Sequence, residues 1–149
     1  MKITNRKFSR DYETVETYEA GISLTGSEVK TIRTGGLKLE NAFVKILDDG
    51  PYLVNAEIPQ YKFSHPQGYD PRRSRKLLLH KSELIRLKTK INSAKGLTII
   101  PTSCYNKRSR FKLEIALCKG RKEVEKRKLE KNRDIEREEK KKIKAYLHN

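Results

Sequence analysis

Residues 110–119 read RFKLEIALCK, a stretch in which apolar and polar side chains alternate. Large apolar residues occupy every second position from Phe111 to Leu117, and Lys112 and Glu114 lie between them. A period of two places alternate side chains on opposite faces of a β-strand. The preceding LTIIPTSCY, residues 97–105, predicts a second strand, and NKRSR at 106–110 is a basic connection. The sequence therefore predicts a β-hairpin here.

The first half of the chain carries further strand and helix signals. DYETVETYEAGISLT, residues 11–25, is rich in Thr, Tyr and Val and predicts one or two strands, kinked near Gly21. A helix should follow in 25–36, since Thr25 and Glu28 have the spacing of a capping box and Gly35 or Gly36 can end the helix. Two apolar stretches, 41–47 and 52–58, flank DDGP and predict a hairpin, in which we expect Pro51 to exclude the tightest turn.

The second half adds a loop and a helix. Residues 59–76, rich in Pro, Gly and Arg, predict a loop. Residues 81–96 place Leu84, Leu87 and Ile91 on one helical face and end at Gly96. Several antiparallel strands with two inserted helices favour a mainly β fold, a small closed barrel, of which the oligonucleotide-binding fold is one type. Periodicity alone leaves the type of barrel open.

The charge balance points to an anionic partner. The 149 residues carry a net charge of +16, and 29 of them, residues 121–149, hold 12 basic and 7 acidic side chains. Residues 1–120 are therefore basic in their own right. A polyphosphate backbone is the natural partner, because bound cations displace its counterions.

Other features of the sequence indicate a cytoplasmic protein. Cys104 and Cys118 lack the spacing of metal ligands and are expected to be free thiols in a reducing compartment. The first ten residues, MKITNRKFSR, have no apolar segment typical of a signal peptide. Apolar runs such as LTIIP are too short to cross a bilayer, so no membrane association is expected.

A catalytic site receives little support. The histidines are His65, His80 and His148, and an acid–base site could be assembled only from Asp70, His80 and Glu83. Glu83 fits better in the first turn of the helix that follows His80, where a carboxylate is stabilised. The sequence has no glycine-rich phosphate loop and no metal-binding motif. We expect neither an enzyme nor a metal or cofactor, and a small RNA-processing enzyme remains an alternative.

Basic clusters are more informative than these candidates. Four are present: Asn5–Lys7, Arg72–Lys76, Lys107–Arg110 and the tail. Arginine suits phosphate because its planar guanidinium donates two parallel hydrogen bonds. Aromatic residues near the clusters could stack on bases, namely Tyr61, Phe63, Tyr69 and Tyr105. Together the clusters favour binding of RNA or DNA.

The C-terminal tail, residues 121–149, predicts structure that depends on a partner. Its apolar residues Val124, Leu129, Ile135 and Ile143 are spaced by 5, 6 and 8 positions, which gives no continuous stripe for a core. Ordering each residue costs about 1–2 kcal/mol, which surface ion pairs worth ~0.2–0.5 kcal/mol do not offset. We expect the tail to be disordered or frayed when free and helical along a partner.

Three motifs resemble a known family. ETYEAGISLTGSEVKTIR at 16–33, DPRRSRKLLLHKSEL at 70–84 and KGLTIIP at 95–101 resemble the SmpB family of SsrA-binding proteins, and the resemblance covers nearly the whole chain. It implies an RNA-binding barrel of the oligonucleotide-binding type over residues 1–120 and a tail over 121–149. It also implies a protein that is not an enzyme and has no cofactor.

The resemblance further implies a role in trans-translation. Members bind the tRNA-like domain of transfer-messenger RNA (SsrA) and deliver it to stalled ribosomes, which leads to peptide tagging and ribosome rescue. The tail is helical on the ribosome, where it probes the empty decoding centre and message channel of the small subunit. Elongation factor Tu is a further partner with the RNA, and the protein is expected to be a monomer. A permanent ribosomal protein with a basic extension is the alternative.

Site residues follow from the resemblance and from the basic clusters. The family's RNA-contacting positions fall on Asn5, Glu19, Leu78 and Lys112. The clusters extend this RNA-binding set to Arg6, Lys7, Arg72, Arg73, Arg75 and Lys76, and the ribosome-binding part of the tail is Arg121, Lys122, Glu125, Lys126 and Arg127. Glu19 could accept hydrogen bonds from base amino groups or orient a neighbouring arginine, and Leu78 could instead serve in packing. Val124 stands where some members have a histidine.

Overall fold

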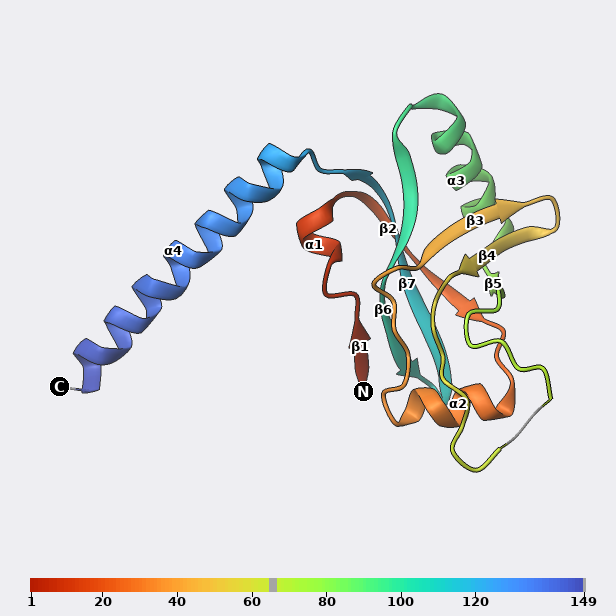
Figure 1. The fold of residues 1–149 in the computed structure, drawn as a ribbon. Coiled ribbons are helices and arrows are strands. Elements are labelled where there is room, and N and C mark those ends of the chain that lie inside the picture. Colours follow the sequence, from red (N-terminus) through yellow and green to blue (C-terminus); the bar gives the residue numbers. More distant parts are fainter. Residues whose placement is uncertain (65–66, 149) are drawn as a thin grey trace.

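The computed structural model describes residues 1–64 and 67–148, and its largest element is an antiparallel sheet (Figure 1). Seven strands follow the order β1-β6-β3-β4-β5-β2-β7, and β6 also pairs with β7, so the sheet nearly closes into a ring. A single residue pair, Val44 with Ile99, joins β3 to β6. The strands are β1 (Lys2–Thr4), β2 (Tyr12–Ile22), β3 (Phe43–Leu47), β4 (Gly50–Val54), β5 (Arg75–Leu78), β6 (Leu97–Lys107) and β7 (Arg110–Gly120). The prediction of a mainly antiparallel β fold with added helices is confirmed.

The β6–β7 hairpin forms where the alternation predicted it. Leu113, Ile115 and Leu117 of β7 are completely buried in the main core. The connection is shorter than expected, because Lys107 pairs with Arg110 and only Arg108 and Ser109 form the turn. Both have positive φ, 51° and 65°, which matches the twist of a two-residue hairpin.

Strand β2 is one continuous strand rather than two. It pairs with β7 along its length, with a register shift between Thr14 and Glu16. Gly21 is not a kink: it pairs with Lys112 on one side and with Leu78 on the other. A Cβ atom at Gly21 would lie 3.3 Å from the Cβ of Leu78, so glycine permits the close approach of β5.

Helix α2 (Gly26–Arg33) begins at the predicted capping box. The backbone N–H of Glu28 donates to Thr25 Oγ1 at 3.2 Å, and the N–H of Thr25 donates to Glu28 Oε1 at 3.0 Å. Gly35, with φ +83°, takes the left-handed conformation that ends the helix. The capping box thus supplies side-chain acceptors to two backbone N–H groups at the start of the helix that have no partner within it.

The β3–β4 hairpin is confirmed, but the expectation about its turn is wrong. Leu47 pairs with Gly50, so the loop contains only Asp48 and Asp49. Pro51 tolerates this tight turn because its partner is Ile46. The pair next to the closing pair of a two-residue hairpin exchanges no hydrogen bonds, so the missing N–H of proline costs no bond within the hairpin.

Helix α3 (Lys81–Ser93) packs on the barrel through the predicted face. Leu87 is completely buried, and Ile91 packs against the core cluster. The predicted loop at 59–76 is present up to the start of β5 at Arg75. Its residues 65 and 66, one of which is His65, lie outside the described residues.

The tail forms one continuous helix, α4 (Glu123–His148), which extends away from the barrel (Figure 1). Its first half is held by the short helix α1 (Phe8–Asp11): Arg10 forms an ion pair with Glu130, and Arg133 Nη2 donates to Ser9 Oγ at 3.0 Å. The sequence did not predict these contacts, because they use charged side chains rather than an apolar stripe. Every helix within the described residues is too short or too polar to cross a bilayer.

Candidate nucleic-acid interface

Residues from five strands form one row across the sheet. Leu78 of β5 pairs with Gly21 of β2, Gly21 pairs with Lys112 of β7, Lys112 pairs with Tyr105 of β6, and Tyr105 pairs with Lys2 of β1. Directly paired residues point their side chains to the same face of a sheet. Leu78 is 61% exposed, so this face is the outer one. The register therefore brings together two predicted site residues, Leu78 and Lys112, on either side of Gly21.

Glu19 lies on the same face, two positions before Gly21 in β2. Its carboxylate accepts hydrogen bonds from the Tyr105 hydroxyl and, at 3.1 Å, from Lys107 Nζ. These hydrogen bonds, together with the positive charges of Lys107 and Lys112, lower the pKa of Glu19. Glu19 is therefore an anion at neutral pH that orients Tyr105 and Lys107, so a lysine takes the place of the arginine that was expected as its neighbour.

Two hollows border the row. One, of about 330 Å³, is lined by Glu19 and by four cations, Lys107, Arg108, Arg110 and Lys112. The other, of about 210 Å³, lies between Leu78, Gly21, Phe111 and Val29 of helix α2. The positive charge of the first hollow suits a phosphate group. The mainly apolar lining of the second suits the edge of a sugar or base.

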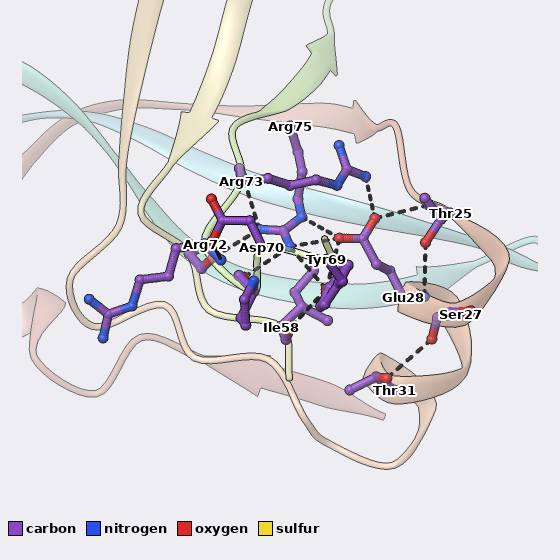
Figure 2. A network of polar contacts seen from close by, with 12 residues as sticks. Thr25, Ser27, Glu28, Thr31, Ile58, Tyr69, Asp70, Arg72, Arg73 and Arg75 are labelled. Carbon is purple, nitrogen blue, oxygen red and sulfur yellow. Dashed lines mark hydrogen bonds and ion pairs between the residues drawn. The ribbon is translucent and has the colours of Figure 1, made fainter. Parts of the chain in front are cut away.

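The Arg72–Lys76 cluster divides between the surface and the interior. Arg75 is completely buried, and its guanidinium is fully engaged, with Nε 2.7 Å from Glu28 Oε2 and Nη1 2.8 Å from the carbonyl of Ala56 (Figure 2). It also donates to the carbonyl oxygens of Arg73 and Pro71. The expectation that Arg75 contacts RNA is therefore corrected: all of its nitrogens hold the 59–74 loop to helix α2.

Glu28 is the acceptor at the centre of this network. Its carboxylate is buried and receives hydrogen bonds from the backbone N–H of Thr25 and from Arg73 and Arg75 (Figure 2). Burial alone would raise its pKa, but the hydrogen bonds from Thr25, Arg73 and Arg75 outweigh burial and the pKa is lowered. Arg73 is partly exposed, whereas Arg72 and Lys76 are exposed, so these three residues form the accessible part of the cluster.

Asn5 is also placed differently from the expectation. Its side chain is buried, and Nδ2 donates to the carbonyl oxygens of Pro101 at 2.9 Å and Leu39 at 3.2 Å. Its Oδ1 accepts from the N–H of Lys7 at 3.2 Å. Asn5 thus fixes the turn that presents the exposed side chains of Arg6 and Lys7, and it does not itself reach the surface.

The predicted ribosome-binding residues lie at the root of α4. Lys126 Nζ lies 3.7 Å from Asp11 Oδ1, and the N–H of Arg121 donates to the carbonyl of Asp11 at 2.8 Å. Three others are exposed to solvent: Lys122, Glu125 and Arg127. Val124 is 76% exposed at the same root. The fold thus fixes where the tail leaves the barrel.

The candidate catalytic residues have local structural roles. Asp70 Oδ1 accepts from the N–H of Arg72 at 2.9 Å, which stabilises a turn. Glu83 Oε1 accepts from the N–H of His80 at 3.3 Å at the start of α3. Within residues 1–64 and 67–148, no group of His, Cys, Asp and Glu is arranged to hold a metal ion. The geometry gives the alternative of an RNA-processing enzyme no support.

One signal in the sequence could have identified the buried arginine. Arg75, Leu77 and Leu79 alternate along β5 and beyond it, and Leu77 is buried in the core. A period of two therefore places Arg75 on the inward face. The assignment of the whole RRSRK cluster to RNA binding overlooked this alternation.

Comparisons with known proteins agree on one family. The sequence profile of the family described as SmpB protein matches residues 2–145. A protein of Sulfurihydrogenibium sp. named SsrA-binding protein is 48% identical over 144 residues, covering 97% of this chain and 94% of its own. Its namesake in Thermosipho africanus is 46% identical over 150 residues, covering 99% and 97%. A solved chain described as "tmRNA-SmpB: a journey to the center of the bacterial ribosome" superposes with a TM-score of 0.67 at 44% identity, covering 82% of this chain and 85% of that one.

Proposed function

The chain belongs to the SmpB family, and from this premise we propose that it is an RNA-binding adaptor of trans-translation. It binds the tRNA-like domain of transfer-messenger RNA (SsrA) and delivers this RNA to stalled ribosomes, which leads to peptide tagging and ribosome rescue. Relatives nearly as long as this chain are named SsrA-binding protein, and the solved relative is described together with tmRNA and the ribosome. Proteins of this family bind RNA and are not enzymes.

The RNA-binding surface we propose is the outer row of the sheet, and its register is the observation that carries the proposal. Lys112 lies beside Gly21 on β7, and the exposed side chain of Leu78 lies against Gly21 from β5. The exposure of Leu78 argues against a role in core packing and suits contact with a sugar or base. Further phosphate contacts come from Arg6, Lys7, Arg72, Arg73 and Lys76, whereas Asn5 and Arg75 act as positioning residues.

We assign the two parts of the chain different tasks. Residues 1–120, a barrel of the oligonucleotide-binding type, grip the RNA, and residues 121–149 act in the small ribosomal subunit. A basic helix without an apolar stripe suits a groove lined by RNA, because charge along the helix complements phosphate. The tail and a message would need the same space in the channel, so only ribosomes without message would admit the tail. Arg121, Lys122, Glu125, Lys126 and Arg127 would anchor it near the decoding centre.

The partner-dependent state of the tail is part of this proposal. Beyond Arg133 the described part of the helix makes no hydrogen bond or ion pair with the barrel, and Ile135, Ile143, Tyr146 and Leu147 are 45–82% exposed. The distal half would therefore fray in the free protein and become fully helical on the ribosome. The protein would act in the cytoplasm as a monomer, with elongation factor Tu present on the same RNA.

Affinity for transfer-messenger RNA tests the proposed function directly. The full-length protein should bind this RNA at least tenfold more tightly than an elongator tRNA of similar size at physiological salt, because specific binding exceeds charge-driven binding. Equal affinity for both RNAs would contradict the proposal.

A further inference from the structure

A second aromatic and basic surface lies on the loop beside helix α2, outside the proposed row. It consists of Lys30, Tyr61, Lys62 and Phe63. Phe63 is 75% exposed, one of the most exposed large apolar side chains of the barrel. The rings of Tyr61 and Phe63 meet edge to face with centroids 5.6 Å apart. Burial of such a ring is normally favourable, so its exposure calls for a partner.

The loop is held in place rather than left free to fold over the ring. The N–H of Ser64 donates to the carbonyl of Tyr61 at 3.1 Å, and Ser27 Oγ of α2 lies 3.1 Å from Ser64 Oγ. Gln60 Nε2 donates to the carbonyl of Ser64 at 2.7 Å. A fixed backbone lowers the entropy cost of ordering an aromatic side chain on binding.

A lysine ammonium group lies near each of the two aromatic rings, Tyr61 and Phe63. Lys30 Nζ lies 5.5 Å from the centroid of Tyr61, and Lys62 Nζ lies 5.5 Å from the centroid of Phe63. Aromatic faces next to lysines on a strongly basic chain match a nucleotide, in which a flat base is joined to a phosphate. A hydrophobic protein surface would gain nothing from these two ammonium groups.

Helix α2 connects this surface to the proposed row. Val29 of α2 lines the hollow that also contains Leu78 and Lys112, whereas Lys30, the next residue, lies over Tyr61. The exposed Arg33 follows one turn later. A strand of RNA that leaves the row would meet cations on α2 before it reached Phe63.

We propose that Tyr61 and Phe63 form a stacking site for an unpaired base of the bound RNA, with Lys30 and Lys62 contacting the phosphates that flank this base. The proposal rests on the proposed function and deepens it, because it adds a contact that depends on an unpaired nucleotide rather than on backbone charge. Phe63 is the ring that meets the base, and Tyr61 supports Phe63 through the edge-to-face contact.

Substitutions at Phe63 in the full-length protein test the site. Phe63→Ala and Phe63→Leu should weaken binding of transfer-messenger RNA by about tenfold, within the range of one stacked base, because neither offers a flat ring. Phe63→Trp should keep the affinity, and its fluorescence should be quenched on binding. The salt dependence should be the same in all four proteins, because stacking releases no counterions. Ile85→Ala, an exposed apolar change on α3, is the matched control and should have no effect.

The outcomes separate this site from the proposed function. Unchanged affinity in Phe63→Leu, with Lys112→Ala still weakened, would overturn the stacking site and leave the function intact. Wild-type protein that does not prefer transfer-messenger RNA would overturn both. If Phe63→Leu bound RNA normally but lost association with ribosomes, Phe63 would be a ribosome contact and the stacking proposal would be wrong.

Discussion

Arg75 and Glu28 form an ion pair that is closed to solvent: Nη2 lies 2.6 Å from Oε2, and neither side chain is more than 1% exposed. The pair connects the start of β5 to the first turn of α2. It helps to hold the 59–74 loop, which precedes β5 and from which Phe63 and the exposed Arg72 project.

Loss of Glu28 should destabilise the fold strongly. Glu28→Ala leaves the guanidinium of Arg75 buried without its counter-charge, and breaking such a pair costs about 3–5 kcal/mol of the free energy of unfolding. Urea denaturation measures this change. Glu83→Ala is the matched control, since Glu83 accepts a helix-start N–H without a buried arginine, and it should cost about 1 kcal/mol. Similar losses in both variants would contradict a special role for the buried pair.

Acid should remove the contribution of Glu28. Because its folded-state pKa is lowered, the stabilisation is fully present above the unfolded-state pKa of about 4.3 and is lost as pH falls through the folded-state value. The difference in unfolding free energy between wild type and Glu28→Gln should therefore shrink below about pH 4. A difference that stayed constant from neutral pH down to about pH 2 would show that the charge of Glu28 is not involved.

Lys112 should account for one phosphate contact. Lys112→Ala should weaken binding of transfer-messenger RNA and reduce the slope of log affinity against log salt by about one contact. Lys119→Ala is the matched control, because Lys119 is exposed on the same strand but lies on the opposite face of the sheet from Lys112. An unchanged slope in Lys112→Ala, or an equal change in Lys119→Ala, would remove Lys112 from the RNA-binding surface.

Truncation after Gly120 should separate the two tasks. The remaining barrel keeps the whole row from Leu78 to Lys2, so RNA affinity should fall less than about threefold, while tagging on stalled ribosomes should stop. Binding and tagging assays on the same preparation measure both. A large loss of RNA affinity would contradict the division at residue 120.

Amide hydrogen exchange rates should differ between the two halves of helix α4, with the change near Arg133. Residues 123–133 contact α1 through Glu130 and Arg133, whereas the distal half relies on the helix alone, so its amides should exchange faster in the free protein. On stalled ribosomes the distal half should become protected. Equal, strong protection of all of α4 in the free protein would rule out partner-dependent folding.

The sequence correctly predicted those elements in which the local sequence pattern and the tertiary packing favour the same structure. Leu113, Ile115 and Leu117 are buried as the alternation required, and Thr25 and Glu28 form the capping box. Prediction from the sequence failed where tertiary contacts bury a residue type that is usually exposed. Arg75 is charged yet buried because Glu28 and backbone carbonyls satisfy it, and no local pattern shows that partner 47 residues away.

The candidate site shows the same limit. The family resemblance predicted Leu78 and Lys112 as site residues, but their common row depends on strand register, which places residues 78, 21, 112 and 105 side by side. The family resemblance predicts that Asn5 contacts RNA, whereas its buried side-chain amide donates to the carbonyl of Pro101, 96 positions away. Long-range pairing of this kind cannot be obtained from composition or spacing.

The RNA that copurifies with this protein tests most directly whether it selects transfer-messenger RNA in the cell. The full-length protein should be isolated from its native cell and the bound RNA sequenced against total RNA. We predict that transfer-messenger RNA is the most enriched species and that enrichment falls in Lys112→Ala. Ribosomal RNA at its bulk proportion, with the protein retained on salt-washed ribosomes, would contradict the account and identify a permanent ribosomal protein instead.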